Sequence, residues 1–125
     1  MSKLPAGKYI IIDPFKAMKK DVAESVLFDY FNNEKHKDTI VVFEAIYGSG
    51  LYSSNQSVNF DIKSGFISVL NFYMSDPLIV AEAIANGNGL IKDFDADFEC
   101  SYENGMLLVG DLLIETNWAY EFFID

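Results

Sequence analysis

The chain has 125 residues, half of them hydrophobic, with 19 Asp or Glu residues, nine basic residues and a formal net charge of −10 at pH 7. A chain of this length buries roughly two-thirds of the surface that its unfolded form exposes, so residues 1–125 are expected to form a single domain without a metal or disulfide staple. Because no apolar run approaches the roughly 20 residues of a membrane span, and the first apolar block is too short for a secretory signal, we expect a cytoplasmic protein with no membrane partner.

The charges are distributed unevenly along the chain. Residues 1–37 carry seven Lys and five acidic residues, whereas residues 38–125 carry two Lys and fourteen acidic residues. None of the basic residues is an arginine, the side chain best suited to forked contacts with phosphate and guanine. We therefore expect no direct nucleic-acid binding. A protein partner with a basic surface is the natural counterpart of such a chain, although acidity is also a common means of keeping a protein soluble.

The N-terminal third predicts a strand followed by a helix. Residues 9–12 form a short apolar block that ends at Asp13 and Pro14, where proline removes a strand donor. Between Asp21 and Asn33 the apolar residues recur every three or four positions, which predicts an amphipathic helix. A polar connector with the only histidine follows.

The middle of the chain predicts three strands and a second helix. Residues 39–47 are a continuous β-branched and aromatic run, typical of a strand covered on both faces. Residues 58–62 alternate between apolar and polar, and a Lys-Ser-Gly turn joins them to a buried strand over 66–73, which predicts a hairpin. The Ser-Asp-Pro sequence at 75–77 predicts the start of a short helix that ends before Asn-Gly-Asn-Gly.

The C-terminal part predicts further strands. Residues 94–103 and 106–115 form two strands joined at Asn104-Gly105, a dipeptide suited to a tight hairpin turn. A last strand in the tail would place Trp118, Tyr120 and Phe122 on one side. Together with the eleven Phe and seven Tyr residues, these elements predict an α+β domain. Its mainly antiparallel sheet would have about six or seven strands, rolled or sandwiched, with one N-terminal amphipathic helix and a second short helix.

The stretch "KDFDADFEC" carries an acidic residue at every odd position from Asp93 to Glu99. A calcium loop starting at Asp93 would need glycine at its sixth position and glutamate at its twelfth, but Phe98 and Asn104 stand there. As a strand, the segment places its apolar residues on one face and its acidic residues on the other. The acidic residues expected on the wet face are Asp93, Asp95, Asp97, Glu99 and Glu103.

This acidic face has two interpretations. Acidic side chains about 6.6–6.8 Å apart along a strand repel one another, and no Lys lies between residues 93 and 103 to offset them. A purely solvating strand would be expected to mix in Lys or Thr, which favours a surface that binds a partner. Alternatively, the acids serve only to solvate the strand. We predict the five acidic residues as the partner-binding site.

Groups for catalysis and metal binding are few. Nucleophilic catalysis needs a base, usually His, and the single His36 lies in the polar connector. Cys100 is expected on the apolar face of its strand, where burial makes a thiol inert, and a zinc site lacks ligands. We therefore predict no catalytic residue, no metal and no cofactor. A pair of carboxylates remains an alternative, and the acids that flank or lie within apolar segments are Asp13, Glu44, Asp61 and Asp111.

Four motifs follow one another along the chain, in the segments Gly7–Pro14, Tyr47–Tyr52, Asp61–Ser68 and Phe98–Thr116. They are a glycine-led strand running into Asp-Pro, a Tyr-Gly-x-Gly-x-Tyr turn, a strand turn with Asp and Gly, and a Phe-x-Cys hairpin with Gly-Asp near its end. In this order they resemble a group of short, uncharacterised proteins of bacteria and their phages. The chain departs from that pattern at Ser49, where the group has an acid, and at Phe15, where a cysteine is common. The resemblance implies the order of elements and a phage or prophage origin, and no site residue.

The sequence supports three hypotheses on function. The first is a small acidic, non-catalytic binding or inhibitor protein that blocks a partner protein, of the counter-defence or immunity type. The second is a binder or sponge for a small nucleotide-like ligand, held near the helix start by Lys16, Lys19 and Lys20. The third is an enzyme that works through carboxylates.

Overall fold

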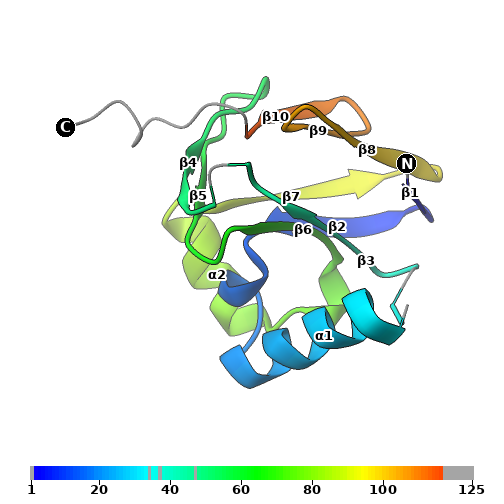
Figure 1. The fold of residues 1–125 in the computed structure, drawn as a ribbon, viewed down its shortest axis with the longest axis vertical. Coiled ribbons are helices and arrows are strands. Elements are labelled where there is room, and N and C mark those ends of the chain that lie inside the picture. The colour runs from blue at the N-terminus through cyan, green and yellow to red at the C-terminus, as the bar shows by residue number, and fades with distance from the viewer. Residues whose placement is uncertain (1, 34, 37, 47, 117–125) are drawn as a thin grey trace.

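The computed structural model describes residues 2–33, 35–36, 38–46 and 48–116, and these residues form three layers (Figure 1). An outer sheet covers one face of a central sheet, and two helices cover the other face. The α+β class with antiparallel sheets is thereby confirmed, while the ten strands of the described residues exceed the expected six or seven. The predicted last strand, with Trp118, Tyr120 and Phe122, lies outside the described residues.

The central sheet consists, in spatial order, of β3 (Ile40–Glu44), β6 (Phe66–Asn71), β2 (Gly7–Ile12) and β7 (Gly89–Phe94). Every neighbouring pair is antiparallel. β2 lies inside the sheet and is covered on both faces, so that its residues from Tyr9 to Ile12 are all fully buried. Double burial explains why this strand is continuously apolar rather than alternating.

The outer sheet consists, in spatial order, of β1 (Ser2–Leu4), β8 (Phe98–Glu103), β9 (Met106–Val109) and β10 (Leu112–Glu115). Its strands are also antiparallel, and β8 and β9 are joined at the predicted Asn104-Gly105 turn, where both residues have positive φ angles of 53° and 80°. A third sheet of two short strands, β4 (Gly50–Tyr52) and β5 (Phe60–Ile62), lies at one end of the sandwich.

The helix layer contains α1 (Lys20–Asn33) and α2 (Pro77–Ala85), and short 3₁₀-helices span Pro14–Lys16 and Phe72–Met74. α2 starts as predicted, because the Asp76 carboxylate accepts hydrogen bonds from the backbone N–H groups of Leu78 and Ile79. In α1 the buried residues are Ala23, Val26 and Leu27. Within the described residues, no helix combines the length and the apolar character needed to cross a membrane.

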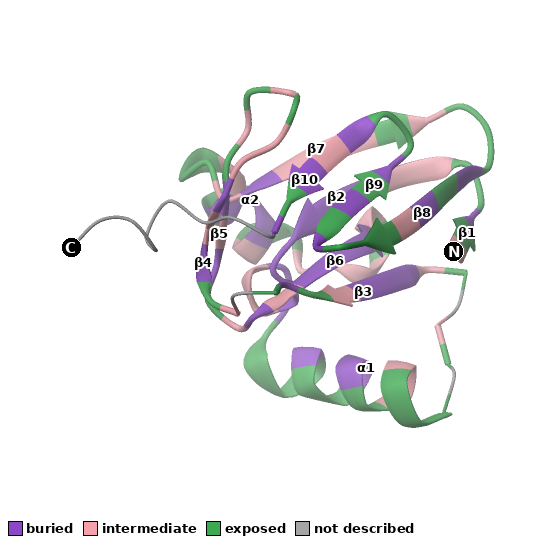
Figure 2. Cartoon of the chain, turned by 45° about the horizontal axis from the view of Figure 1, so that its top comes forward, coloured by how far each residue is buried: buried purple, intermediate pink, exposed green. Residues whose placement is uncertain are grey.

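Two apolar cores separate the three layers. The core between the two large sheets includes Tyr9, Ile11, Phe98 and Leu107, and the core between the central sheet and the helices includes Ile10. Successive residues of β2 therefore enter opposite cores, as the two-residue period of a strand requires. Figure 2 shows many of the buried positions on the strands of the two packed sheets.

Two predictions about the strands are wrong. β5 and β6 do not form a hairpin, because β5 pairs with β4 while β6 pairs with β2 and β3. The expected strand over residues 106–115 is instead two strands, since Gly110 adopts a φ angle of 58° and turns the chain so that β10 pairs with β9. A left-handed residue inside an apolar run therefore ends the strand where composition alone suggests continuity.

We predict that Gly110→Ala destabilises the fold more than Gly87→Ala. Both glycines have positive φ angles, 58° and 73°, so an alanine at either position is strained by about 1–2 kcal/mol. A Cβ on Gly110 would also lie 3.0 Å from the ring of Phe94, whereas no atom lies within 4 Å of the corresponding position at Gly87. The Phe94 ring cannot move away easily, because it stacks on Phe98 at a centroid distance of 3.6 Å. Urea unfolding of both variants measures the difference, and equal losses of stability would argue against this tight contact.

Candidate functional site

The five acidic residues predicted to bind a partner do not share one strand face. β7 ends at Phe94 and β8 begins at Phe98, so the expected single strand across this segment is wrong. Between these strands the chain crosses from the central sheet to the outer sheet, and packed sheets lie about 10 Å apart. Asp93 lies on β7, Asp95 and Asp97 lie in the crossing, and Glu99 and Glu103 lie on β8. All five are exposed, as predicted.

Lysine residues from the N-terminal strands lie opposite two of these acids. The strand register places Lys8 opposite Asp93 and Lys3 opposite Glu99. Opposite charges at such cross-strand positions typically contribute roughly 0.2–1 kcal/mol. Lysines from strands more than 80 residues away in the chain therefore lie across from Asp93 and Glu99 in the strand register, while the Lys8 ammonium itself lies over the Phe72 ring, 4.5 Å from its centroid.

A third acid of the segment contributes to local structure. The carboxylate of Asp97 accepts a hydrogen bond of 3.1 Å from the backbone N–H of Ala6. This bond connects the crossing between β7 and β8 to the connection between β1 and β2. Asp97 thus links two connections that run between the sheets, and its carboxylate has a structural role.

The outer sheet has one apolar face and one mixed face. The buried residues of the inner face are Leu4, Phe98, Cys100, Leu107, Val109, Leu112 and Ile114. Residues on the solvent face include Glu99, Glu103, Met106, Leu108, Leu113 and Glu115, which we call the glutamate face. Exposed and buried positions alternate along β8 to β10 (Figure 2).

The glutamate face has an apolar centre with acidic residues around it. Met106 and Leu108 are 40% and 41% exposed. Leu108 lies opposite Leu113 across the β9–β10 pair. Met106 lies between Glu103 on one side and Glu115 on the other. Two of the five predicted acids, Glu99 and Glu103, therefore border a surface whose apolar members and third glutamate were not predicted.

A sequence signal for this surface exists. The two-residue Asn104-Gly105 turn fixes the pairing of β8 with β9 and places Glu103 opposite Met106. Alternation along β9 then assigns Met106 and Leu108 to the same face as Glu103. The signal was missed because "MLLV" is apolar throughout, so its composition does not distinguish the wet positions from the buried ones.

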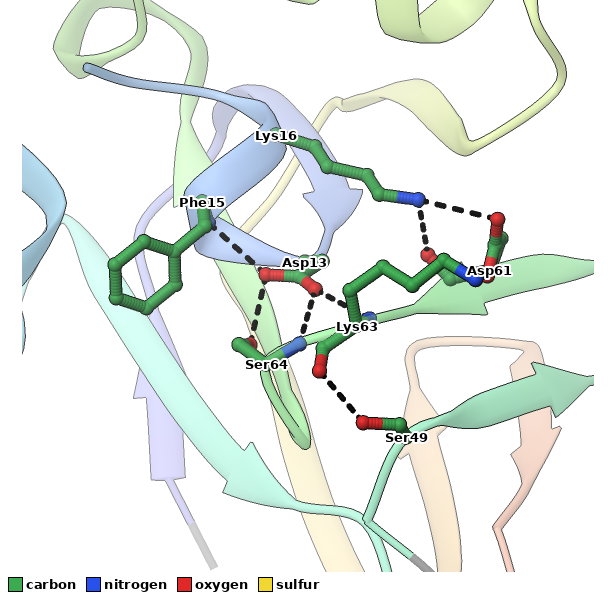
Figure 3. Close-up of polar contacts among 7 residues, drawn as sticks. All are labelled: Asp13, Phe15, Lys16, Ser49, Asp61, Lys63 and Ser64. Carbon is green, nitrogen blue, oxygen red and sulfur yellow. Dashed lines mark hydrogen bonds and ion pairs between the residues drawn. The ribbon is translucent and has the colours of Figure 1, made fainter. Parts of the chain in front are cut away.

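A second polar cluster forms at the junction of the Pro14–Lys16 helix with the turn between β5 and β6 (Figure 3). Asp13 is fully buried there. Its Oδ2 atom accepts hydrogen bonds from the backbone N–H groups of Lys63 (2.8 Å) and Ser64 (2.9 Å). Its Oδ1 atom accepts from the Phe15 N–H (3.0 Å) and the Ser64 hydroxyl (2.8 Å). Four donors thus satisfy this carboxylate, and we call this arrangement the Asp13 clamp.

Beside the Asp13 clamp, two lysines surround Asp61. The Lys16 ammonium donates to the Asp61 carbonyl oxygen at 2.8 Å and lies 3.4 Å from Oδ2 of the same residue. Lys63 Nζ lies 3.2 Å from Oδ1, close enough for an ion pair, although no hydrogen bond of good geometry from the described residues reaches this buried oxygen. An ammonium group can rotate its three donors, so Lys63 neutralises this oxygen as an ion pair. Lys16 is therefore already engaged within the protein.

The predicted anion site is not assembled around the helix start. Lys16 faces Asp61, whereas the Lys20 side chain is 83% exposed and its ammonium lies 4.0 Å from Glu24. A groove of about 520 Å³ does lie between α1, β3 and β1. It is lined by Ser2, Lys3, Tyr30, Phe31, Asp38, Ile40 and Val41. One lysine and one aspartate give this groove no excess of positive charge.

Few described groups have the geometry of catalytic or metal-binding residues. Among the described residues, no cluster of three or more His, Cys, Asp or Glu side chains is arranged to hold a metal ion. His36 lies on the loop after α1, and its Nε2 atom is 3.9 Å from the carboxylate of Asp29, a residue of α1. Cys100 is fully buried between the sheets, and burial raises the pKa of its thiol to about 12.

Comparisons of this chain with protein-family models, with curated proteins and with solved structures found no match. The functional interpretation therefore depends on the residues themselves. Three of the four sequence motifs meet at the Asp13 clamp, through Asp13, Ser64 and Ser49, whose hydroxyl donates to the Lys63 carbonyl at 2.6 Å. These motif residues therefore have structural partners within the described part of the chain.

We predict that Asp13→Asn costs roughly 2–4 kcal/mol of stability. Hydrogen bonds to a charged acceptor are worth about 1.5–3 kcal/mol each, and the amide nitrogen would face backbone N–H donors that it cannot satisfy. Asp95→Asn removes the same charge from an exposed position in the crossing and should change stability by no more than about 0.5 kcal/mol. Chemical unfolding of both variants tests the comparison, and a tolerated Asp13→Asn substitution would contradict the structural role of the clamp.

We also predict that the Cys100 thiol is protected in the folded protein. Because the folded pKa is about 12 and the ordinary value is 9.0, the unfolded chain loses this proton first. The associated stability is present below about pH 9 and is lost as the pH rises toward about 12. Iodoacetamide at about pH 8 should modify Cys100 rapidly in denaturant and only slowly in the native state. Equal rates in both states would show that the thiol is accessible.

Proposed function

We propose that the protein is a small acidic, non-catalytic binding protein of the cytoplasm that covers a basic surface of a partner protein and so blocks it. The observation that carries this proposal is the glutamate face, with apolar side chains at its centre and glutamates around them. A phage or prophage origin is part of the proposal and is supported by the motif resemblance alone. A counter-defence or immunity role is also part of it and is supported only by analogy with inhibitors of similar size and charge.

The layout of the glutamate face supports protein binding. Stable interfaces combine a desolvated apolar centre with a polar rim, and anchor residues near the centre supply most of the binding energy. Met106, Leu108 and Leu113 would supply the centre, and the three glutamates would supply the rim. With a net charge of −10, the protein would attract a positively charged partner from a distance and accelerate their encounter.

A purely solvating function explains the face less well. An antiparallel sheet with one face in water normally carries polar residues at the wet positions. Single exposed apolar residues are common on protein surfaces and need no explanation. Here, however, the exposed Met106 and Leu108 lie on the same face of β9, and the half-buried Leu113 lies opposite Leu108 on the adjacent strand. Such a cluster is typical of an interaction surface.

The two other hypotheses have less support among the described residues. A nucleotide-like ligand would need the ammonium groups of Lys16, Lys19 and Lys20, and Lys16 is engaged by Asp61. Carboxylate catalysis would need an acid with a free oxygen in a concave site, and the buried Asp13 has both oxygens occupied by hydrogen bonds. We therefore do not propose either function.

Two triple variants test the proposal. E99Q/E103Q/E115Q removes three charges from the glutamate face, and D93N/D95N/D97N removes three charges from β7 and the crossing. Capture of a partner from a bacterial lysate, followed by inhibition assays on the identified partner, should show about tenfold weaker binding for the first variant. This estimate follows because exposed ion pairs contribute roughly 0.2–1 kcal/mol each and 1.4 kcal/mol is tenfold in affinity.

The salt dependence supplies the control. The wild-type protein should release its partner as salt is raised, since rim charges are screened, and this sensitivity should decrease in E99Q/E103Q/E115Q. D93N/D95N/D97N should bind like the wild type, because an Asn at position 97 retains the oxygen that accepts the Ala6 N–H. If the second variant weakens binding and the first does not, the glutamate face is not the binding surface.

A further inference from the structure

The spacing of the glutamate face resembles the dimensions of an α-helix. Glu103 and Glu115 flank Met106 on the two neighbouring strands, and strands lie about 4.7–4.9 Å apart, so the two glutamates are separated by about 9.5 Å. Met106 and Leu108, on the strand between them, are about 6.8 Å apart along the strand direction. An α-helix has a diameter of about 10–12 Å, and its residues i and i+4 are about 6 Å apart along its axis.

We infer that the glutamate face binds a basic amphipathic α-helix of the partner, an inference that depends on the proposed function. The helix would lie along β9, with apolar residues at i and i+4 over Met106 and Leu108. Lysine or arginine residues on its two flanks would reach Glu103 on one side and Glu115 on the other. Glu103 and Glu99 are four residues apart on β8, about 13 Å. Helix residues i and i+7, or i and i+11, share a flank and are about 10.5 or 16.5 Å apart along the axis, so a basic residue on that flank would reach Glu99 through its long side chain.

Charge complementarity disfavours the other occupants of this face. In a dimer of two such faces, the glutamates of one copy would approach the glutamates of the other, and like charges at close range repel. A nucleic acid would bring phosphate groups against the same carboxylates. A basic helix instead brings cations to Glu103 and Glu115 and covers the apolar centre.

The edges of the outer sheet also disfavour an extended partner segment. A bound strand would need a free sheet edge for its backbone hydrogen bonds. The edge of β10 is already occupied, because the Glu115 N–H donates to the Ser53 carbonyl (3.1 Å) and the Asn55 N–H donates to the Leu113 carbonyl (3.0 Å). The opposite edge is β1, which has only three residues. The broad surface available in this sheet is therefore its face, and a helix can bind a face through side chains alone.

A synthetic peptide provides a direct test. The probe is a helical peptide of about 18 residues with leucines at i, i+4 and i+7 and lysines on both flanks of this stripe. Its binding to the full chain is measured by fluorescence anisotropy. E99Q/E103Q/E115Q should weaken binding about tenfold, at about 1.4 kcal/mol per tenfold. Leu108→Ser should also weaken it several-fold, because an apolar contact at the centre is lost.

Two matched controls make the result specific. D21N/E24Q/E82Q removes three charges from the helix layer, on the opposite side of the central sheet, and should leave the affinity unchanged within about twofold. A peptide of the same length and charge, with prolines at two positions outside the leucine stripe and its lysine flanks, cannot form the helix and should bind at least tenfold more weakly. Equal weakening by both triple variants, or equal binding of the broken peptide, would overturn the inference.

The captured partner separates this inference from the proposed function. If E99Q/E103Q/E115Q loses the partner and cross-linking places Leu108 against a helix with basic flanks, both hold. If the variant loses the partner but the cross-linked segment is a loop or a strand, the helix inference is wrong and the proposed function stands. If the variant retains the partner fully, the proposed function fails whatever the peptide does.

Discussion

The apolar layer between the central and outer sheets determines where the charged residues of this chain can lie. The inward positions of the outer sheet hold mostly buried apolar residues, with the neutral Cys100, Ser2 and Tyr102 among them, and none carries a charge. Consequently, each charged residue near the C-terminal end of the described chain must lie on the opposite face, in a turn, or in the crossing between β7 and β8. The glutamate face is thus a consequence of how the two sheets pack, and Glu99 and Glu115 could not change places with their sequence neighbours without burying a charge.

The same packing brings some of the acidic residues close to lysines from the N-terminal segment. The lysine-rich N-terminal segment supplies β1 and β2, which pair with the acidic β8 and β7. Lys3 and Lys8 therefore lie opposite acids that are distant in sequence, and part of the charge imbalance between the two parts of the chain disappears in the folded state. Glu103 and Glu115 instead lie opposite the apolar Met106 across the strands, so the acidity remains concentrated at this part of the glutamate face.

The features predicted correctly from the sequence are those that depend on residues close together in the chain. The strand ending at Asp13-Pro14, both helices and the Asn104-Gly105 turn are confirmed, since caps, prolines and two-residue turns act within a few positions. The pairing of strands was predicted less well, because it depends on residues far apart in the chain. β5 and β6 look like a hairpin in sequence, yet they join different sheets, and residues 93–103 look like one strand although they cross between sheets. Of the candidate site, two glutamates were predicted, and its apolar centre was not, because an all-apolar strand does not reveal which residues face water.

The two interpretations of the acidic residues, solvation and partner binding, need not exclude each other. Exposed Met106 and Leu108 on a flat sheet face would favour aggregation if they stood alone, and charged residues around an apolar patch oppose it. The same glutamates would attract a basic partner whose apolar residues cover the centre. Because the face is built on hydrogen-bonded strands, it requires little ordering on binding, which leaves more of the contact energy for affinity. A surface that keeps the free protein soluble is therefore also suited to binding a basic, amphipathic partner.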